Sequence, residues 1–169
     1  MQATVKIDCE LAIQKIEKKD NVFSIKKRVE NLELKYLPYY LFKAEMTFKK
    51  DQSITQHICV DTINGEYAFV EREKLNLTEN EIEINKSNLD ENEASLIAKN
   101  AVKSMLMVQK GKGTDLEKIE LQLETVFNYP YWIGYYKRKS GIDFEVVDAV
   151  NGKKQGVKMK PVFIKLIMQ

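Results

Sequence analysis

Two short motifs each occur twice in this chain, in the same order, and this internal repeat constrains the fold more than any other feature. Residues 36–40 read Tyr-Leu-Pro-Tyr-Tyr, and residues 128–132 read Asn-Tyr-Pro-Tyr-Trp. Residues 59–65 read Cys-Val-Asp-Thr-Ile-Asn-Gly, and residues 146–152 read Val-Val-Asp-Ala-Val-Asn-Gly. Repeated motifs in a conserved order indicate repeated structure, so we expect two related halves.

Each expected half begins with apolar residues at helical intervals. In the second half, Asp90 and Glu93 form a capping-box pattern that predicts the start of a helix, and the acidic first turn suits the helix dipole. The apolar positions are Ile7, Leu11, Ile13 and Ile16 in the first half, and Leu96, Ile97, Ala101, Met105 and Val108 in the second.

Strand patterns follow each predicted helix, as in the strict alternation of Ile119, Leu121 and Leu123. The Asn-Gly pairs at 64–65 and 151–152 predict hairpin turns, because both residue types tolerate a positive φ. We therefore predict an α+β chain of two related units, each a helix followed by antiparallel strands. Residues 1–75 form the first unit, residues 76–89 an acidic linker and residues 90–169 the second unit, with an apolar tail that is either a helix beginning at Pro161 or a final strand.

The composition argues against several kinds of partner and compartment. The net charge is only +2, and the basic residues are mostly lysine, whereas specific nucleic-acid recognition favours arginine, so we expect no nucleic-acid partner. The chain as given has no signal-peptide pattern and no apolar run long enough to span a bilayer. These features predict a soluble cytoplasmic chain without membrane insertion, or an envelope-associated one if a signal or anchor has been removed.

The sharpest chemical candidate is the segment with His57, Cys59 and Asp61, which would face one side of a strand and suggests a metal site or an enzyme. The repeat aligns His57 with Phe144 and Cys59 with Val146, so a buried structural face is favoured. One histidine and two cysteines also make a poor structural zinc site. We expect both cysteines, Cys9 and Cys59, to be buried thiols.

Asp61 and Asp148 occupy the same place in the two repeats, three residues before each Asn. They are either paired functional carboxylates or acceptors for the amides of their own turns. One carboxylate for each turn favours the second interpretation.

Aromatic residues cluster after each predicted helix and are the best candidates for a recognition surface. Tyrosine and tryptophan can anchor a protein partner, or they can simply pack on the sheet, which is the favoured alternative. The candidate surface consists of Tyr39, Tyr40, Tyr131, Trp132, Tyr135 and Tyr136.

The two hairpin motifs resemble the ending of the PepSY domain, in which a strand closes on Val-Asp-Ala-x-x-Gly. Residues 147–152 fit this ending, and residues 60–65 fit it with Thr in place of Ala. The resemblance implies a tandem of small non-catalytic α+β modules, with regulatory contacts to other proteins at the cell envelope. It carries over no catalytic residues, and the Tyr-Pro-Tyr elements are not part of it.

The leading functional prediction is a non-catalytic binding or regulatory module, with no catalytic residue, cofactor or metal. The partner is then a protein or a second copy of the chain. The first alternative is an assembly subunit that pairs through sheet edges near Pro38 and Pro130. The less favoured alternative is a metal-binding protein or enzyme centred on His57, Cys59 and Asp61.

Overall fold

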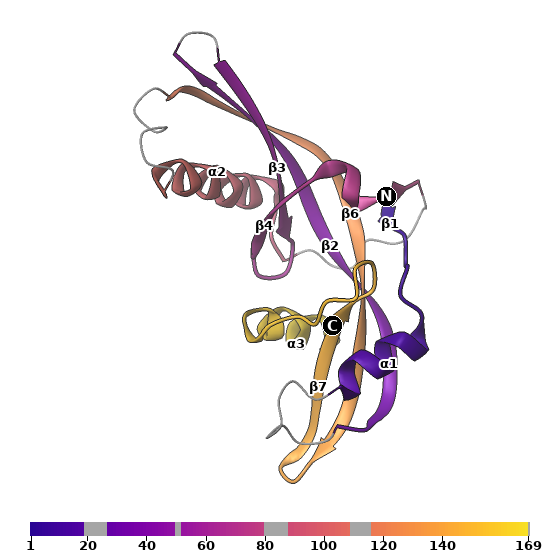
Figure 1. The fold of residues 1–169 in the computed structure, drawn as a ribbon. Helices are drawn as coiled ribbons and strands as arrows, with labels where there is room; N and C mark the ends of the chain where they lie inside the picture. The colour runs from indigo at the N-terminus through magenta and orange to yellow at the C-terminus, as the bar shows by residue number, and fades with distance from the viewer. Residues whose placement is uncertain (19–26, 50–51, 80–87, 109–115, 169) are drawn as a thin grey trace. The chain divides into compact units, whose positions relative to one another are not determined.

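The computed structural model describes residues 1–18, 27–49, 52–79, 88–108 and 116–168. Figure 1 shows the elements in chain order. They are β1 (Gln2–Ala3), α1 (Cys9–Glu17), β2 (Val29–Phe48), β3 (Gln52–Asp61), β4 (Tyr67–Val70), the 3₁₀ helix η1 (Arg72–Leu75), β5 (Leu77–Thr78), α2 (Glu91–Val108), β6 (Leu116–Arg138), β7 (Gly141–Asp148), the 3₁₀ helix η2 (Val157–Met159) and α3 (Lys160–Ile167).

The strands belong to one large mixed sheet with the order β4-β3-β2-β6-β1-β5, and β7 pairs with β6. The pairs β2–β3, β3–β4 and β6–β7 are antiparallel, whereas β1 runs parallel to β6. The prediction of two units, each a helix followed by its own antiparallel strands, is therefore wrong. The sheet is shared because β2 and β6 are very long, at 20 and 23 residues.

The two prolines explain why the long strands were missed. Proline in a sheet is typical of an edge, a bulge or a strand entry, yet Pro38 and Pro130 both lie inside continuous strands. Proline cannot donate to a ladder, but its carbonyl can still accept. The Pro38 carbonyl accepts from the Thr62 amide at 3.0 Å, and the Pro130 carbonyl accepts from the Ala149 amide at 3.1 Å.

The chain divides into two compact units, and each draws on both expected halves. Unit 1 contains residues 1–2 and 38–128, and it holds α2, β3 and β4. Unit 2 contains residues 3–37 and 129–168, and it holds α1, β7 and α3. The unit boundaries thus fall within β2 and β6 rather than at residues 75 and 90. Most of the expected linker, residues 80–87, lies outside the described residues.

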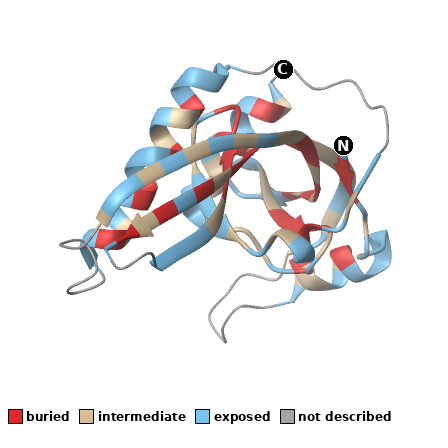
Figure 2. Ribbon diagram, turned by 90° about the horizontal axis from the view of Figure 1, so that it is seen from above, coloured by how far each residue is buried: buried red, intermediate tan, exposed pale blue. Residues whose placement is uncertain are grey.

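The core of unit 1 lies between α2 and one face of the sheet. Alternate residues of β2 and β3 point to α2, and buried residues alternate with more exposed ones along the strands in Figure 2. The helix face differs from the one predicted, since Leu96 and Val108 are exposed. The buried cluster is Phe42, Ala44, Met46, Phe48, Ile58, Val60, Ala94, Ala98, Val102 and Leu106.

Unit 2 buries one side of each of its two helices. Asp8 caps α1 by accepting a 2.8 Å hydrogen bond from the Leu11 amide, and Ala12 and Ile16 are buried. The apolar tail forms a helix beginning near Pro161, as one of the two alternatives predicted. Its buried residues are Val162, Phe163 and Leu166.

Both repeated aspartates accept hydrogen bonds from the amides of their own turns, which confirms the interpretation favoured from the sequence. One carboxylate oxygen of Asp61 accepts from the amides of Ile63 and Asn64 at 2.9 and 2.8 Å, and the other accepts from Glu66 at 2.6 Å. Asp148 likewise accepts from the second and third residues after it, at 2.8 and 3.0 Å.

The glycines, rather than the asparagines, supply the positive φ in these turns. Gly65 has φ of 76° and Gly152 has φ of 72°. In the described part of the chain, Asn76 is the only non-glycine residue with a positive φ. No helix within the described ranges is long and apolar enough to cross a membrane.

Candidate functional site: an apolar groove beside strand β4

The strand β4 lies at one end of the sheet order and carries two exposed aromatic side chains. Tyr67 pairs with Val60 and Phe69 pairs with Ile58 across the β3–β4 ladder. Val60 and Ile58 are fully buried in the cluster under α2, and cross-strand partners share a face, so both aromatics point to the α2 side. They remain 44% and 37% exposed, because α2 does not cover the last strand completely.

The register also fixes where the backbone groups of β4 point. The Asp61 amide donates to the Glu66 carbonyl at 2.9 Å, so this pair belongs to the hydrogen-bonded set. In an antiparallel ladder, hydrogen-bonded and non-hydrogen-bonded pairs alternate. Ala68 therefore directs its N–H and C=O to β3, whereas Tyr67 and Phe69 direct theirs outward. No described strand pairs with that outer side of β4.

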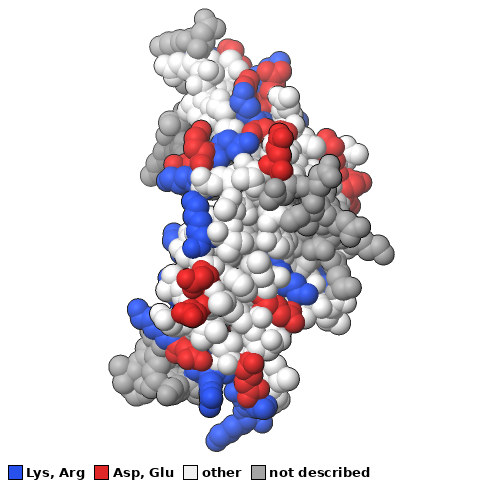
Figure 3. Space-filling view, turned by 90° about the vertical axis from the view of Figure 1, so that its right-hand side faces the viewer, with Lys and Arg blue, Asp and Glu red and all other residues white. Residues whose placement is uncertain are grey.

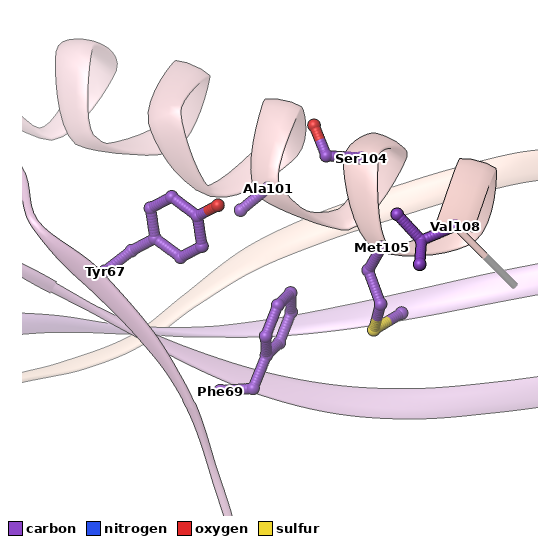
Figure 4. Close-up of a pocket in the computed structure, with 6 residues that line it drawn as sticks. All are labelled: Tyr67, Phe69, Ala101, Ser104, Met105 and Val108. Carbon is purple, nitrogen blue, oxygen red and sulfur yellow. The ribbon is translucent and has the colours of Figure 1, made fainter.

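A groove of about 340 Å³ separates these aromatics from α2. Figure 4 shows the Tyr67 hydroxyl pointing to Ala101 at one end, and Phe69 lying near Met105 at the other. The rings of Tyr67 and Phe69 meet edge to face at a centroid distance of 6.1 Å. The lining residues are Tyr67, Phe69, Ala101, Ser104, Met105 and Val108.

The chemistry of the groove suits binding. Its lining contains no carboxylate, histidine, lysine or cysteine, so it offers no general acid or base that works near neutral pH. The hydroxyls of Tyr67 and Ser104 supply polar atoms at an otherwise apolar wall. A few polar groups in an apolar groove are typical of ligand sites.

The side chains of His57, Cys59 and Asp61 make structural contacts rather than a shared chemical site. His57 Nε2 lies 3.3 Å from a Glu124 oxygen, and Arg72 Nε lies 2.5 Å from the other. Burial raises the pKa of the Cys59 thiol to about 12, so it is not a thiolate at neutral pH. Across the described ranges, three or more His, Cys, Asp or Glu side chains nowhere gather as metal ligands.

The expectation of two buried cysteines is half right. Cys59 is buried, but Cys9 is exposed. Cys9 is the first residue of α1 and lies three and seven residues before the buried Ala12 and Ile16, so it shares their face of the helix but stays exposed in the first turn. Both thiols are free.

The predicted aromatic surface lies mostly within the packing of each unit. Tyr39, Tyr131 and Tyr136 are buried. Tyr40 and Trp132 are half-buried, and each donates a hydrogen bond to a main-chain carbonyl, Leu89 at 3.2 Å and Ile7 at 2.7 Å. Tyr135 is also half-buried, and its hydroxyl lies 3.3 Å from a carboxylate oxygen of Glu33.

Sequence reasoning missed the exposed aromatics on β4. The signal was present, because Tyr67 and Phe69 alternate in a short strand directly after an Asn-Gly turn. Nothing in the sequence marks this strand as the edge of the sheet, which is what leaves the two rings exposed.

Acidic and basic side chains are interspersed on the face drawn in Figure 3, so no strongly charged patch on that face marks a second candidate site. No family model, curated protein or solved structure matches this chain. The resemblance to PepSY domains therefore stays a prediction based on the two hairpin motifs.

Proposed function

We propose that this chain is a non-catalytic binding module, and that it captures an extended peptide segment of a partner protein along β4. The observation that carries the proposal is the position of Tyr67 and Phe69. The same two residues present outward backbone groups and side chains that line the groove. A peptide strand added to such an edge gains main-chain hydrogen bonds, and pockets for its side chains provide specificity.

The geometry predicts which peptide residues enter the groove. Residues directly opposite one another in a sheet share a face. Peptide residues i and i+2, placed opposite Tyr67 and Phe69, would therefore point to the α2 side, where Met105 and Val108 lie. We expect the preferred peptide to carry two apolar side chains at that spacing.

The size of the site favours a peptide over a globular partner. A specific interface between folded proteins uses roughly 20–30 residues on each side. Here six residues line the groove, and the exposed edge strand is four residues long. A volume of about 340 Å³ is near the lower end of the range for ligand sites and suits a pair of side chains.

Selection of peptides from a random library displayed on phage tests this proposal, followed by fluorescence anisotropy with the selected sequences. We expect Phe69→Ala to weaken binding by about 2 kcal/mol, or roughly 30-fold, if the ring is a central anchor. The matched control is Ile54→Ala on β3, which removes a comparably exposed apolar side chain outside the groove and should leave affinity unchanged.

A charge at the groove provides a second and stricter comparison. Val108 lines the groove and is 81% exposed, whereas the adjacent Met107 is 80% exposed and does not line it. Val108→Asp should abolish peptide binding and Met107→Asp should not, while both alter the helix end equally. Equal losses in the two variants would contradict the proposal. Self-association of the chain that occupies β4 would also contradict it.

A further inference from the structure

The segment from residue 149 to residue 169 has a charge that the total composition conceals. It contains no Asp or Glu, although the net charge of the whole chain is only +2. An uninterrupted positive segment creates a local potential even where the overall charge is small. Its five basic residues are Lys153, Lys154, Lys158, Lys160 and Lys165.

The same segment exposes a line of apolar side chains. Val157, Pro161, Ile164 and Met168 follow one another at intervals of four, three and four residues, and all four are exposed. Only Pro161 and Ile164 belong to α3 itself, since Val157 begins η2 and Met168 is the C-cap residue of α3. The buried residues of α3 are Val162, Phe163 and Leu166, and Pro161 and Ile164 lie on its exposed side, with Val157 and Met168 exposed just before and after the helix.

Lysines accompany the apolar face along its length. Lys158 and Lys165 are exposed and adjoin it in sequence. Lys154 and Lys160 pair with carboxylates of unit 2, Glu145 at 3.2 Å and Asp143 at 3.0 Å, so their charges are largely compensated. The positive charge beside the apolar side chains therefore comes mainly from Lys158 and Lys165, and we call residues 157–168 the α3 surface.

We propose that the α3 surface docks on an anionic lipid bilayer, as a peripheral contact that does not span the membrane. Its apolar side chains would enter the interfacial region, and the lysines would contact head groups while their alkyl stems cover apolar surface. The strength of interfacial attachment grows with the apolar area buried and with the attraction to anionic lipids, and the α3 surface offers both.

The residue types favour a bilayer over a protein partner. Energetic anchors of protein interfaces are enriched in Trp, Tyr and Arg, and the exposed face of α3 has none of these. Lysine is a compact charge on a flexible stem and suits a diffuse anionic surface, whereas arginine suits bidentate contacts. Aliphatic and thioether side chains likewise require no shaped pocket.

Sedimentation with lipid vesicles tests this inference independently of peptide binding. We expect the full chain to bind phosphatidylcholine vesicles containing about one third phosphatidylserine at least tenfold more tightly than pure phosphatidylcholine. Raising the salt from about 0.1 M to about 0.5 M should weaken the binding, because screening shortens the reach of the lysines. Equal binding to both vesicle types, or no binding to either, would overturn the proposal.

Two pairs of variants separate the apolar and the charged contributions. Ile164→Ser with Met168→Ser should reduce binding about tenfold, whereas Ile142→Ser, at an exposed position on β7, should not. Lys158→Gln with Lys165→Gln should reduce binding about tenfold, whereas Lys99→Gln with Lys103→Gln, on α2, should not. All these sites are exposed, so unchanged melting temperatures will show that the fold is intact.

A soluble polyglutamate peptide distinguishes the alternative partner. If it binds as tightly as the vesicles do, and the apolar substitutions have no effect, the surface recognises acidic protein segments and the bilayer proposal fails.

Discussion

Trp132 donates a 2.7 Å hydrogen bond from its indole nitrogen to the main-chain carbonyl of Ile7, which lies 125 residues earlier in the chain. Ile7 precedes the N-cap of α1, and its own amide donates to the Ala149 carbonyl at 2.9 Å. In unit 2, the segment leading into α1 is therefore held by a strand and a turn from the other end of the sequence.

Unit 1 has the equivalent arrangement, in which an aromatic residue and a turn of the first repeat hold the segment that leads into α2. Tyr40 donates to the Leu89 carbonyl at 3.2 Å, just before α2, and the Leu89 amide donates to the Thr62 carbonyl at 3.0 Å. Tyr40 and Trp132 are aligned in the internal repeat, as are Thr62 and Ala149. Each helix is thus joined to the hairpin motif of the other repeat.

Removing these two aromatic donors should destabilise the chain unequally. Trp132→Phe loses a short hydrogen bond and part of a large ring, and leaves the Ile7 carbonyl without this donor. We expect a loss of about 2 kcal/mol in the free energy of unfolding. Tyr40→Phe loses a longer hydrogen bond and no ring carbon, so about 1 kcal/mol is expected. Urea denaturation measures both, and the reverse order would show that these contacts do not fix the helices.

The two turn aspartates should respond differently to the same substitution. In Asp61→Asn, the new NH₂ group would face the Glu66 amide, which now donates to the carboxylate at 2.6 Å. Two donors cannot satisfy each other, so we expect a cost of roughly 1–3 kcal/mol. In Asp148, the corresponding oxygen accepts from the side chains of Tyr129 and Asn151 at 3.1 and 2.7 Å, and the Tyr129 hydroxyl can rotate to accept from the new NH₂ group.

Asp148→Asn should therefore cost less than Asp61→Asn. Thermal melts of the two variants beside the wild type provide the comparison. Equal destabilisation would mean that the amide of Glu66 is not what distinguishes the turns.

The Cys59 thiol predicts a decline in stability at alkaline pH. Burial raises its pKa from an ordinary value of 9.0 to about 12 in the folded chain. A raised pKa contributes stability that is fully present below about pH 9 and is lost as the pH rises toward 12. At about pH 10.5 the loss from this group is about 2 kcal/mol.

Cys59→Val is the matched control, since valine occupies the aligned position 146. Urea unfolding of the wild type and this variant at neutral and alkaline pH isolates the thiol, because the other titrating groups are shared. If the free energy of unfolding fell equally with pH in the wild type and in Cys59→Val, the raised pKa of the Cys59 thiol would be contradicted. A thiol reagent should also modify the exposed Cys9 alone in the folded chain.

Local features of the fold were predictable from sequence, because they depend on neighbours in the chain. The capping box of α2 is present as predicted: Glu93 donates its amide to Asp90 at 2.8 Å, and Asp90 donates its amide to Glu93 at 3.1 Å. The turn aspartates and the helix after Pro161 are of the same kind. Hydrogen bonds within a few residues leave a direct trace in the sequence.

The pairing of the strands left no such trace. A proline in an apolar run is typical of a strand boundary, yet Pro38 and Pro130 lie where the chain continues without a break. The helix–hairpin partnership was likewise assigned to neighbours along the chain, whereas α1 packs with β7 and α2 with β3. The groove depends on both facts, because it needs α2 beside β4.

The most direct test of the proposed function is amide hydrogen exchange of β4 with and without a selected peptide. Tyr67 and Phe69 direct their amides away from β3, so these should exchange rapidly in the free chain and become protected in the complex. Ala68, whose amide faces β3, should be protected in both states. Protection gained at Tyr67 and Phe69 is the result we predict. A bound peptide that leaves these two amides exchanging rapidly would show that it does not pair with β4, and would contradict the account.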